Sequence, residues 1–174
     1  MRKLKKGLIQ IYTGNGKGKT TAALGLALRA ASAGLSVYLM QFLKNGAYNE
    51  MKAIKKIKNI RAEQCGRGCL IKRKAKKIDI DCAVKGLLRA RETIMSGRYD
   101  IVILDEISVA LQLGLLKTGD IIDVMNQKPC HVELVLTGRY CPGALKRRAD
   151  LVTEMREVKH PYQKGVKARP GIEY

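Results

Sequence analysis

Short apolar stretches alternate along this chain with longer stretches whose apolar positions follow a helical spacing. Six stretches predict strands, because each is a run of about four to eight mainly apolar residues bounded by turn residues. They cover residues 7–14, 36–43, 60–64, 99–106, 131–138 and 151–158, and the third is the weakest. Helices are predicted between them at residues 18–33, 79–97 and 118–127. Strands alternating with helices favour an α/β fold, with a parallel sheet covered on both faces.

The predicted helices have suitable ends. Gly34 and Gly97 stand where the first two helices should stop, and Asp79 and Asp120 lie close to the starts of the second and third. The segment at residues 65–78 has the least regular pattern, with two glycines, two cysteines and many basic residues. We expect this segment to be mobile or to close over a ligand.

The length and composition of the chain predict how many domains it forms and in which compartment it works. A chain of 174 residues predicts a single domain over residues 1–174, large enough to bury a core without disulfides. We expect no signal peptide, because glycines soon interrupt the apolar run that follows the basic N-terminus. No apolar run approaches the ~20 residues that span a bilayer, so we expect no membrane partner and a cytoplasmic protein.

The net charge of +19 is unevenly distributed. Residues 1–43 carry seven basic and no acidic side chains, residues 44–98 carry sixteen and five, and residues 99–174 carry eleven and ten. The basic excess therefore lies in the first 98 residues, where it would attract a nucleotide, a nucleic acid or an acidic protein. Single-strand binders usually place aromatic residues among the basic ones, and residues 52–78 contain no aromatic residue. We therefore expect no nucleic-acid partner.

The five cysteines do not predict disulfides, because their number is odd and the expected compartment is reducing. Cys65 and Cys69 have a spacing at which a metal site can begin. No second cysteine pair stands at ligand spacing, and His131 and His160 are isolated. We expect no structural zinc.

The stretch TGNGKGKTT, at residues 13–21, predicts a phosphate-binding loop between the first strand and the first helix. The general pattern is G-x-x-x-x-G-K-[ST], and Gly18, Lys19 and Thr20 supply its end. Thr13 occupies the first glycine position, with Gly14 beside it. A dinucleotide-binding loop would need a glycine in place of Lys19 and an acidic residue about 20 positions later. The first acidic residue is Glu50, so we reject that alternative.

The chemistry of such a loop follows from its residue types. Glycines let successive amide groups turn toward an anion, and the helix start adds unpaired donors. Lys19 brings a positive charge to the phosphates, and the Thr20 hydroxyl suits Mg²⁺.

Two further motifs end strands that should finish at the same edge of the sheet. The run Ile101–Leu104 ends in Asp105 and Glu106, whose carboxylates can approach a metal ion held by Thr20. Such an acidic pair can also simply cap the next helix, but the phosphate loop favours the metal site. Arg139 follows another strand and suits phosphate or ribose contacts. These features predict a nucleotide-binding parallel α/β protein, while the reaction stays open among kinases, hydrolases, switches and motors.

The combination of motifs is more specific than any one of them. Over residues 8–174 the chain resembles the P-loop type of ATP:corrinoid adenosyltransferases, and the stretches that carry the resemblance are TGNGKGKTTAALGLALRA, VYLMQFLK, ILDEISVALQLGLL, LTGRYCP, ADLVTEMREVKHPYQKGVKA and GIEY. The resemblance implies a RecA-like, mostly parallel six-stranded sheet, a homodimer, and MgATP (or MnATP) and a corrinoid reduced to Co(I) as substrates. The expected products are an adenosylated corrinoid and triphosphate.

The resemblance also assigns roles to residues. The expected ATP contacts are Gly14, Asn15, Gly16, Lys17, Gly18, Lys19, Thr20, Thr21, Arg29 and Arg139. The expected metal ligands are Thr20, Asp105 and Glu106, and the residues that serve the reaction are Lys19, Thr20 and Glu106. Co(I) supplies its own electron pair, so no catalytic base is expected.

One segment departs from the family. Better-known members carry a G-F-x-W type sequence after the third strand, whose aromatic residues pack against the corrinoid. This chain has CGRGCLI at residues 65–71, with Cys69 and Ile71 at the aromatic positions. The expected corrinoid contacts are therefore Cys69, Leu70 and Ile71, which offer less contact area than the aromatic residues of better-known members. An acidic flavoprotein that delivers the electron is a further expected partner of the basic middle segment.

Two other functions compete with this one. A RecA-like ATPase or kinase would use the same loop for chemistry at the γ-phosphate, and its products would be ADP with phosphate or a phosphorylated acceptor. A non-enzymatic module would bind RNA or single-stranded DNA through residues 52–78, with a steep salt dependence. Intact triphosphate as the product distinguishes the adenosyltransferase from the ATPase or kinase.

Overall fold

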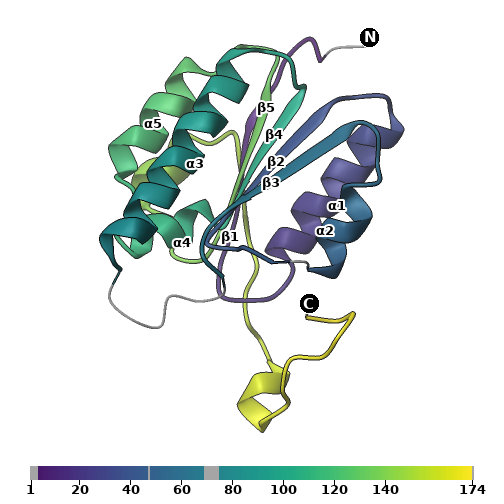
Figure 1. The fold of residues 1–174 in the computed structure, drawn as a ribbon, viewed down its shortest axis with the longest axis vertical. Helices are drawn as coiled ribbons and strands as arrows, with labels where there is room; N and C mark the ends of the chain where they lie inside the picture. The colour runs from purple at the N-terminus through teal and green to yellow at the C-terminus, as the bar shows by residue number, and fades with distance from the viewer. Residues whose placement is uncertain (1–3, 47, 69–74, 174) are drawn as a thin grey trace.

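The computed structural model describes residues 4–46, 48–68 and 75–173. Within these residues six strands form one sheet in the order β3-β2-β4-β5-β1-β6, and all neighbouring pairs are parallel (Figure 1). The strands are β1 (Ile9–Thr13), β2 (Val37–Phe42), β3 (Ile60–Cys65), β4 (Ile101–Asp105), β5 (Glu133–Thr137) and β6 (Leu151–Glu154). The predicted α/β fold with a parallel six-stranded sheet is confirmed.

Helices cover both faces of the sheet. They are α1 (Lys19–Ser32), α2 (Asn49–Ile54), α3 (Lys77–Met95), α4 (Ile107–Gln112), α5 (Thr118–Gln127) and α6 (Gly143–Lys146), and a 3₁₀ helix, η1, spans Pro161–Lys164. Figure 1 shows α1 and α2 on one face and α3, α4 and α5 on the other. The three predicted helices are α1, α3 and α5. The others have only four to six residues, too few for a periodic pattern to indicate them.

Each strand contributes to two cores, because successive side chains point to opposite faces. In β4, Ile101 and Ile103 pack in the core beneath α1 and α2, while Val102 and Leu104 pack in the core beneath α3, α4 and α5. Burial on both faces explains why the central strands are continuous apolar runs in the sequence. Helix α1 meets the sheet through buried alanines, including Ala23, so its axis can lie close to the strands.

The parallel arrangement brings the carboxyl ends of the strands to one edge. Strand β5 lies between β1 and β4, with Tyr12 opposite Thr137 and Leu104 opposite Leu136. On the other side of β4, Gln41 of β2 lies opposite Asp105. The loop after β1 and the acidic end of β4 therefore flank the end of β5.

The last strand is shorter than predicted, because β6 ends at Glu154 and the chain then leaves the sheet. Residues 155–173, which we call the C-terminal segment, carry η1 and extend beyond this edge of the sheet (Figure 1). None of the helices in the described ranges is both long and apolar enough to cross a membrane. The organisation of residues 1–174 as a single domain stays a prediction.

Candidate active site

The glycine-rich loop connects β1 to α1 at the carboxyl edge of the sheet. Gly14 and Gly18 have φ angles of 97° and 112°, which favour glycine. Gly18 occupies the N-cap position of α1 and has no side chain with which to cap the helix. The first amide groups of α1 are therefore suitably placed to bind an anion.

Lys19 lies underneath this loop and is buried. Its Nζ donates hydrogen bonds to the carbonyl oxygens of Gly14 and Gly16, at 2.8 and 2.7 Å. Burial lowers the pKa of the Lys19 ammonium, because desolvation disfavours the charged form. A polyphosphate in the loop would favour that charged form again.

Asp105 is fully buried and is contacted by four side chains from three different elements or their ends. The hydroxyl groups of Thr20 and Thr137 donate to its Oδ1 at 2.9 and 2.7 Å. Gln41 Nε2 donates to Oδ2 at 3.0 Å, and Lys44 Nζ lies 3.5 Å from the same oxygen. Asp105 and Thr20, predicted to share a metal ion, are thus in direct contact.

Glu106 follows in an unusual conformation. Its φ and ψ angles of 60° and 20° are left-handed, which is uncommon for a residue other than glycine. Its amide group donates to Thr137 Oγ1 at 3.0 Å, so Thr137 links the backbone of Glu106 to the carboxylate of Asp105. Burial, and next the nearby Asp105 carboxylate, raise the pKa of Glu106.

The oxygen atoms gathered here suit Mg²⁺. This ion prefers oxygen ligands and usually takes one or two carboxylates, together with waters and phosphate oxygens of the substrate. The Thr20 hydroxyl, the Asp105 carboxylate and the adjacent Glu106 provide such a set. In the described part of the chain, no group of three or more histidine, cysteine, aspartate or glutamate side chains could hold a metal ion alone. Substrate oxygens would have to complete the coordination.

The two predicted arginines lie in different places. Arg139 follows the end of β5, and its charge acts on the pKa values of both Lys19 and Glu106, so it lies near the loop. Arg29 is exposed in the last turn of α1, ten residues beyond Lys19 and therefore about 15 Å along the helix. The structure does not bring Arg29 together with the loop.

The remaining predicted nucleotide contacts differ in exposure. Asn15, Lys17 and Thr21 are exposed on the loop and the first turn of α1, whereas Gly16 is buried. The expected corrinoid contacts Cys69, Leu70 and Ile71 lie outside the described residues. Just before them, burial raises the pKa of the Cys65 thiol to about 12, so this thiol is protonated and unreactive at neutral pH.

No local sequence pattern indicated that the C-terminal segment packs directly on the loop. Gly16 N donates to the carbonyl oxygen of Met155 at 2.7 Å, and Met155 N donates to that of Thr13 at 2.8 Å. A Cβ atom at Gly14 would lie 2.4 Å from the Met155 oxygen, and one at Gly16 would lie 2.8 Å from it. This packing alone therefore requires a glycine at both positions, apart from their predicted role in binding an anion.

Three side chains around Asp105 were also missed: Gln41, Lys44 and Thr137. The only sequence signal was position, since each stands at or just after the end of a predicted strand.

A glycine-rich loop between the first strand and the first helix, a lysine beneath it and a threonine bonded to an aspartate define the P-loop class of nucleotide-binding proteins. Within that class, the chain belongs to the family ATP:corrinoid adenosyltransferase BtuR/CobO/CobP, whose sequence model matches residues 5–174. The family resemblance found from the sequence motifs is confirmed, and the family is one of transferases.

Curated relatives agree with this assignment. The chain is 32% identical over 169 residues to the corrinoid adenosyltransferase CobA of Salmonella typhimurium, covering 97% of this chain and 86% of that protein. It is 35% identical over 173 residues to a corrinoid adenosyltransferase of a Sinorhizobium species, covering 97% and 81%. A corrinoid adenosyltransferase of Escherichia coli is 31% identical over 169 residues, covering 97% and 86%.

Proposed function

We propose that this protein transfers the 5′-deoxyadenosyl group of ATP to the Co(I) centre of a reduced corrinoid and releases triphosphate. One observation carries the proposal. In a chain that matches the family over residues 5–174, the loop with Lys19 beneath it lies at the same sheet edge as the bonded pair Thr20 and Asp105. Loop and pair together suit the triphosphate part of ATP with its metal ion.

The reaction balances without a proton transfer. The electron pair of Co(I) forms the bond to C5′ of the ribose, while the bond from C5′ to the triphosphate oxygen breaks and its electrons leave with triphosphate. Cobalt is thereby oxidised from Co(I) to Co(III). The protein has to position the two substrates and stabilise the growing negative charge. Lys19 and the loop amides, from Gly14 to Thr21, are suited to that task.

Thr20, Asp105 and Glu106 would hold Mg²⁺, or Mn²⁺, beside the triphosphate. The bound ion would offset negative charge on the leaving group. The left-handed backbone of Glu106 and the bond from its amide group to Thr137 support a role as a ligand, and the reaction needs no base from it. Arg139 would contact the nucleotide from the end of β5. Arg29, about 15 Å along α1 from Lys19, would reach only a part of the nucleotide that extends away from the loop.

The test is an anaerobic reaction of the protein with ATP, Mg²⁺ and a chemically reduced corrinoid. We expect light-sensitive adenosylcorrinoid and an equal amount of intact triphosphate. Lys19→Ala should lower the rate by at least about 100-fold, because it removes a preorganised charge on the leaving group. Lys56→Ala, at an exposed position just beyond α2 on the other face of the sheet, is the matched control and should keep full activity. ADP with phosphate, or a phosphorylated acceptor, would instead support chemistry at the γ-phosphate.

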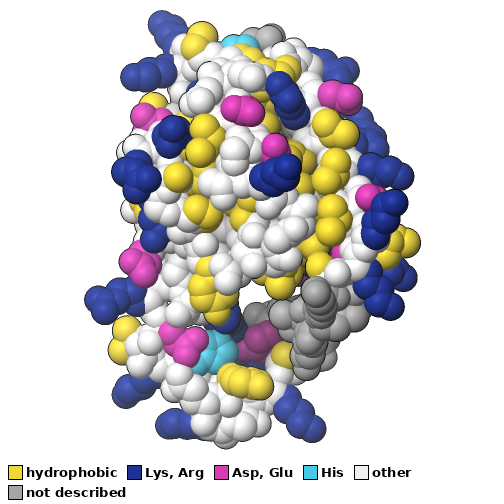
Figure 2. Space-filling model, turned by 90° about the vertical axis from the view of Figure 1, so that its left-hand side faces the viewer, with side chains coloured by type: hydrophobic (Ala, Val, Ile, Leu, Met, Phe, Trp, Pro, Cys, Tyr) yellow, Lys and Arg dark blue, Asp and Glu magenta, His cyan; other side chains and the backbone are white. Residues whose placement is uncertain are grey.

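We further propose that the protein acts as a cytoplasmic homodimer. On α3, Ile80, Val84 and Leu88 recur every fourth residue and are exposed. Figure 2 shows apolar side chains gathered on the face that carries α3 and α5. Such a stripe commonly marks a contact with another protein.

A second copy of the chain suits this face. Val84 and Leu88 line a groove of about 200 Å³ between α3 and α5, together with Arg91, Asp120 and Asp123. Both signs of charge are therefore present on one surface, so a two-fold axis could pair the arginine of one copy with the aspartates of the other. An acidic flavoprotein reductant is a further proposed partner, and the basic excess of residues 44–98 supports it.

A further inference from the structure

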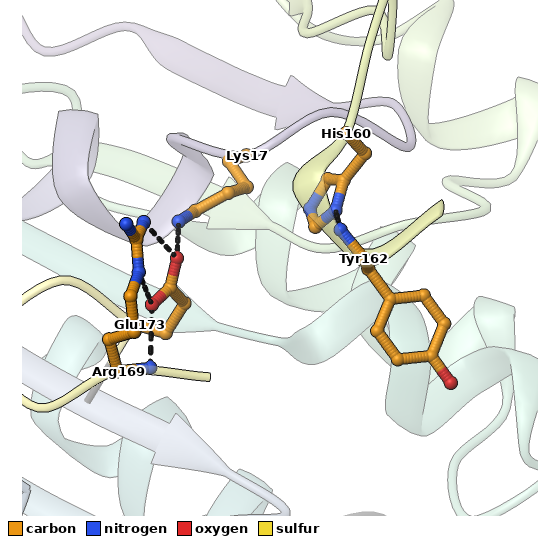
Figure 3. Close-up of polar contacts among 5 residues, drawn as sticks. All are labelled: Lys17, His160, Tyr162, Arg169 and Glu173. Atoms are coloured by element: carbon orange, nitrogen blue, oxygen red, sulfur yellow. Dashed lines mark hydrogen bonds and ion pairs between the residues drawn. The ribbon is translucent and has the colours of Figure 1, made fainter. Parts of the chain in front are cut away.

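Both ends of the C-terminal segment rest on adjacent residues of the phosphate loop. At its start, the carbonyl oxygen of Met155 accepts the Gly16 N–H at 2.7 Å. At its end, Glu173 Oε1 lies 2.7 Å from Lys17 Nζ (Figure 3). The segment therefore leaves the loop, turns through η1 and returns to the loop.

The Glu173 carboxylate is held in place by its own segment. Arg169 N donates to Glu173 Oε2 at 2.8 Å, and Arg169 Nη2 lies 3.2 Å from Oε1 (Figure 3). Glu173 N in turn donates to the carbonyl oxygen of Arg169 at 3.0 Å. These contacts, Arg169 first and then Lys17, lower the pKa of Glu173 to about 2. The carboxylate is thus an ionised acceptor that Arg169 and Lys17 hold together.

Other contacts order the middle of the segment. His160 Nδ1 accepts the Tyr162 N–H at 3.1 Å, and Gln163 Nε2 donates to Glu157 Oε1 at 2.6 Å. Figure 3 shows the Tyr162 ring directed away from Lys17. The segment therefore meets the loop through Met155 and Glu173, while Glu157 and Tyr162 serve its own fold.

We propose that Glu173 is a positioning residue that competes with the triphosphate part of the nucleotide for Lys17. The proposal rests on the proposed function, in which triphosphate is the leaving group. A carboxylate and a phosphate oxygen are both anionic acceptors for one ammonium group. Glu173 already occupies Lys17 at 2.7 Å, so a polyphosphate bound in the adjacent loop can recruit this lysine only by breaking the ion pair.

The expected effect is on the affinity for triphosphate. Lys19 binds from beneath the loop, whereas Lys17 stands on its outer side with 44% of its side chain exposed. Glu173 acts on this outer lysine alone. Glu173 therefore weakens the binding of released triphosphate to Lys17, while Lys19, the cation on which the reaction depends, is unaffected. Product would therefore leave faster than it would from a loop in which Lys17 had no carboxylate partner.

Isothermal titration calorimetry of the full-length protein with magnesium and inorganic triphosphate tests this proposal. We expect Glu173→Gln to lower the Kd by roughly three- to tenfold, because a neutral amide holds Lys17 less tightly than a carboxylate does and leaves its ammonium group to the phosphate oxygens. Glu157→Gln is the matched control, since it removes the same charge from the same segment at a residue that contacts Gln163. Its Kd should equal that of the unchanged protein.

A double-mutant cycle tests whether the effect passes through Lys17. In a Lys17→Gln background, Glu173→Gln should change the Kd by less than about twofold, since the lysine for which the two anions compete is gone. An unchanged or higher Kd for triphosphate in Glu173→Gln overturns the proposal. So does an equal decrease of the Kd on Glu173→Gln in the unchanged protein and in the Lys17→Gln variant. The titration uses no corrinoid, so its result is independent of whether the protein forms adenosylcorrinoid.

Hydrogen exchange on the unmodified protein gives a second test that needs no variant. Added triphosphate should draw Lys17 away from Glu173 and speed exchange at the amides of residues 169–173. Slower or unchanged exchange in this range would overturn the proposal.

Discussion

At the scale of single residues, the candidate site depends on one buried carboxylate and the donors around it. Asp105 is fully buried and pairs with two hydroxyl groups, an amide and a lysine. A buried charge with fewer partners would be costly, because desolvation is repaid only by several good contacts. The same contacts align Thr20 and Glu106 beside it. The hydrogen bonds that offset the cost of burying Asp105 therefore also set the geometry of the proposed metal site.

Thr137→Val tests this network. Valine has the same shape but can neither donate to Asp105 nor accept from the Glu106 amide, so two buried groups lose a partner. We expect the free energy of unfolding to fall by about 1–3 kcal/mol. The adenosylation kcat/KM should fall by roughly 10–100-fold, as for other residues that support metal ligands. Urea unfolding and the anaerobic assay measure the two effects.

Thr153→Val is the control, since Thr153 is exposed on β6. Its free energy of unfolding should stay within about 0.5 kcal/mol of the unchanged protein. Equal stability and activity in the Thr137 variant would show that the Thr137 hydroxyl does not support the site.

At the scale of elements, β1, its loop and the extension of β6 form one tightly packed unit. Met155 bonds both to Thr13 at the end of β1 and to Gly16 in the loop. This close approach leaves no room for side chains at Gly14 and Gly16. The loop is thus held in shape from one side by the chain that follows β6, before any nucleotide binds.

Two glycine-to-alanine changes should have opposite effects on stability. Gly14→Ala meets both a positive φ of 97° and a contact of 2.4 Å with Met155, so it should destabilise the protein by about 2 kcal/mol or more. Gly25→Ala, in the interior of α1 with open space around its new Cβ, should stabilise it by about 0.5–1 kcal/mol. Urea unfolding of both variants is the measurement. A stable Gly14→Ala variant would contradict the tight packing of Met155 on the loop.

At the scale of the whole molecule, a rigid sheet with two cores presents one functional edge and one apolar face. The site lies at the carboxyl edge, where the loop, Asp105 and the C-terminal segment meet. The exposed apolar residues Ile80, Val84 and Leu88 belong to α3, which covers one face of the sheet (Figure 1). Assembly and chemistry would therefore use different parts of the surface.

Light scattering after size-exclusion chromatography tests the proposed dimer. The unchanged protein should have twice the monomer mass, and Leu88→Asp should convert it to a monomer by placing a charge in an apolar interface. Leu28→Asp is the matched control. Leu28 is also about half exposed, at 52% against 54%, but lies on α1 on the opposite face of the sheet. A monomer at all concentrations, or equal effects of the two variants, would contradict an interface on α3.

The patterns that predicted the fold were local ones. The apolar runs from Val37 to Phe42 and from Ile101 to Leu104 indicated buried strands, because a strand covered on both faces needs apolar residues at every position. The loop and the Asp105–Glu106 pair were recognisable because their chemistry depends on neighbouring residues in the chain. Helices α2, α4 and α6 were missed because four to six residues make no periodic signal.

The sequence by itself thus determined the class of fold, the phosphate loop and the family, since each depends on residue types at short spacings. Only the tertiary structure decided the strand order, the four partners of Asp105, and the contacts of Met155 and Glu173 with the loop. Lys17 and Glu173 are 156 positions apart in the chain. Such contacts arise because the parallel sheet brings distant strand ends to one edge, and no local pattern encodes which ends will meet.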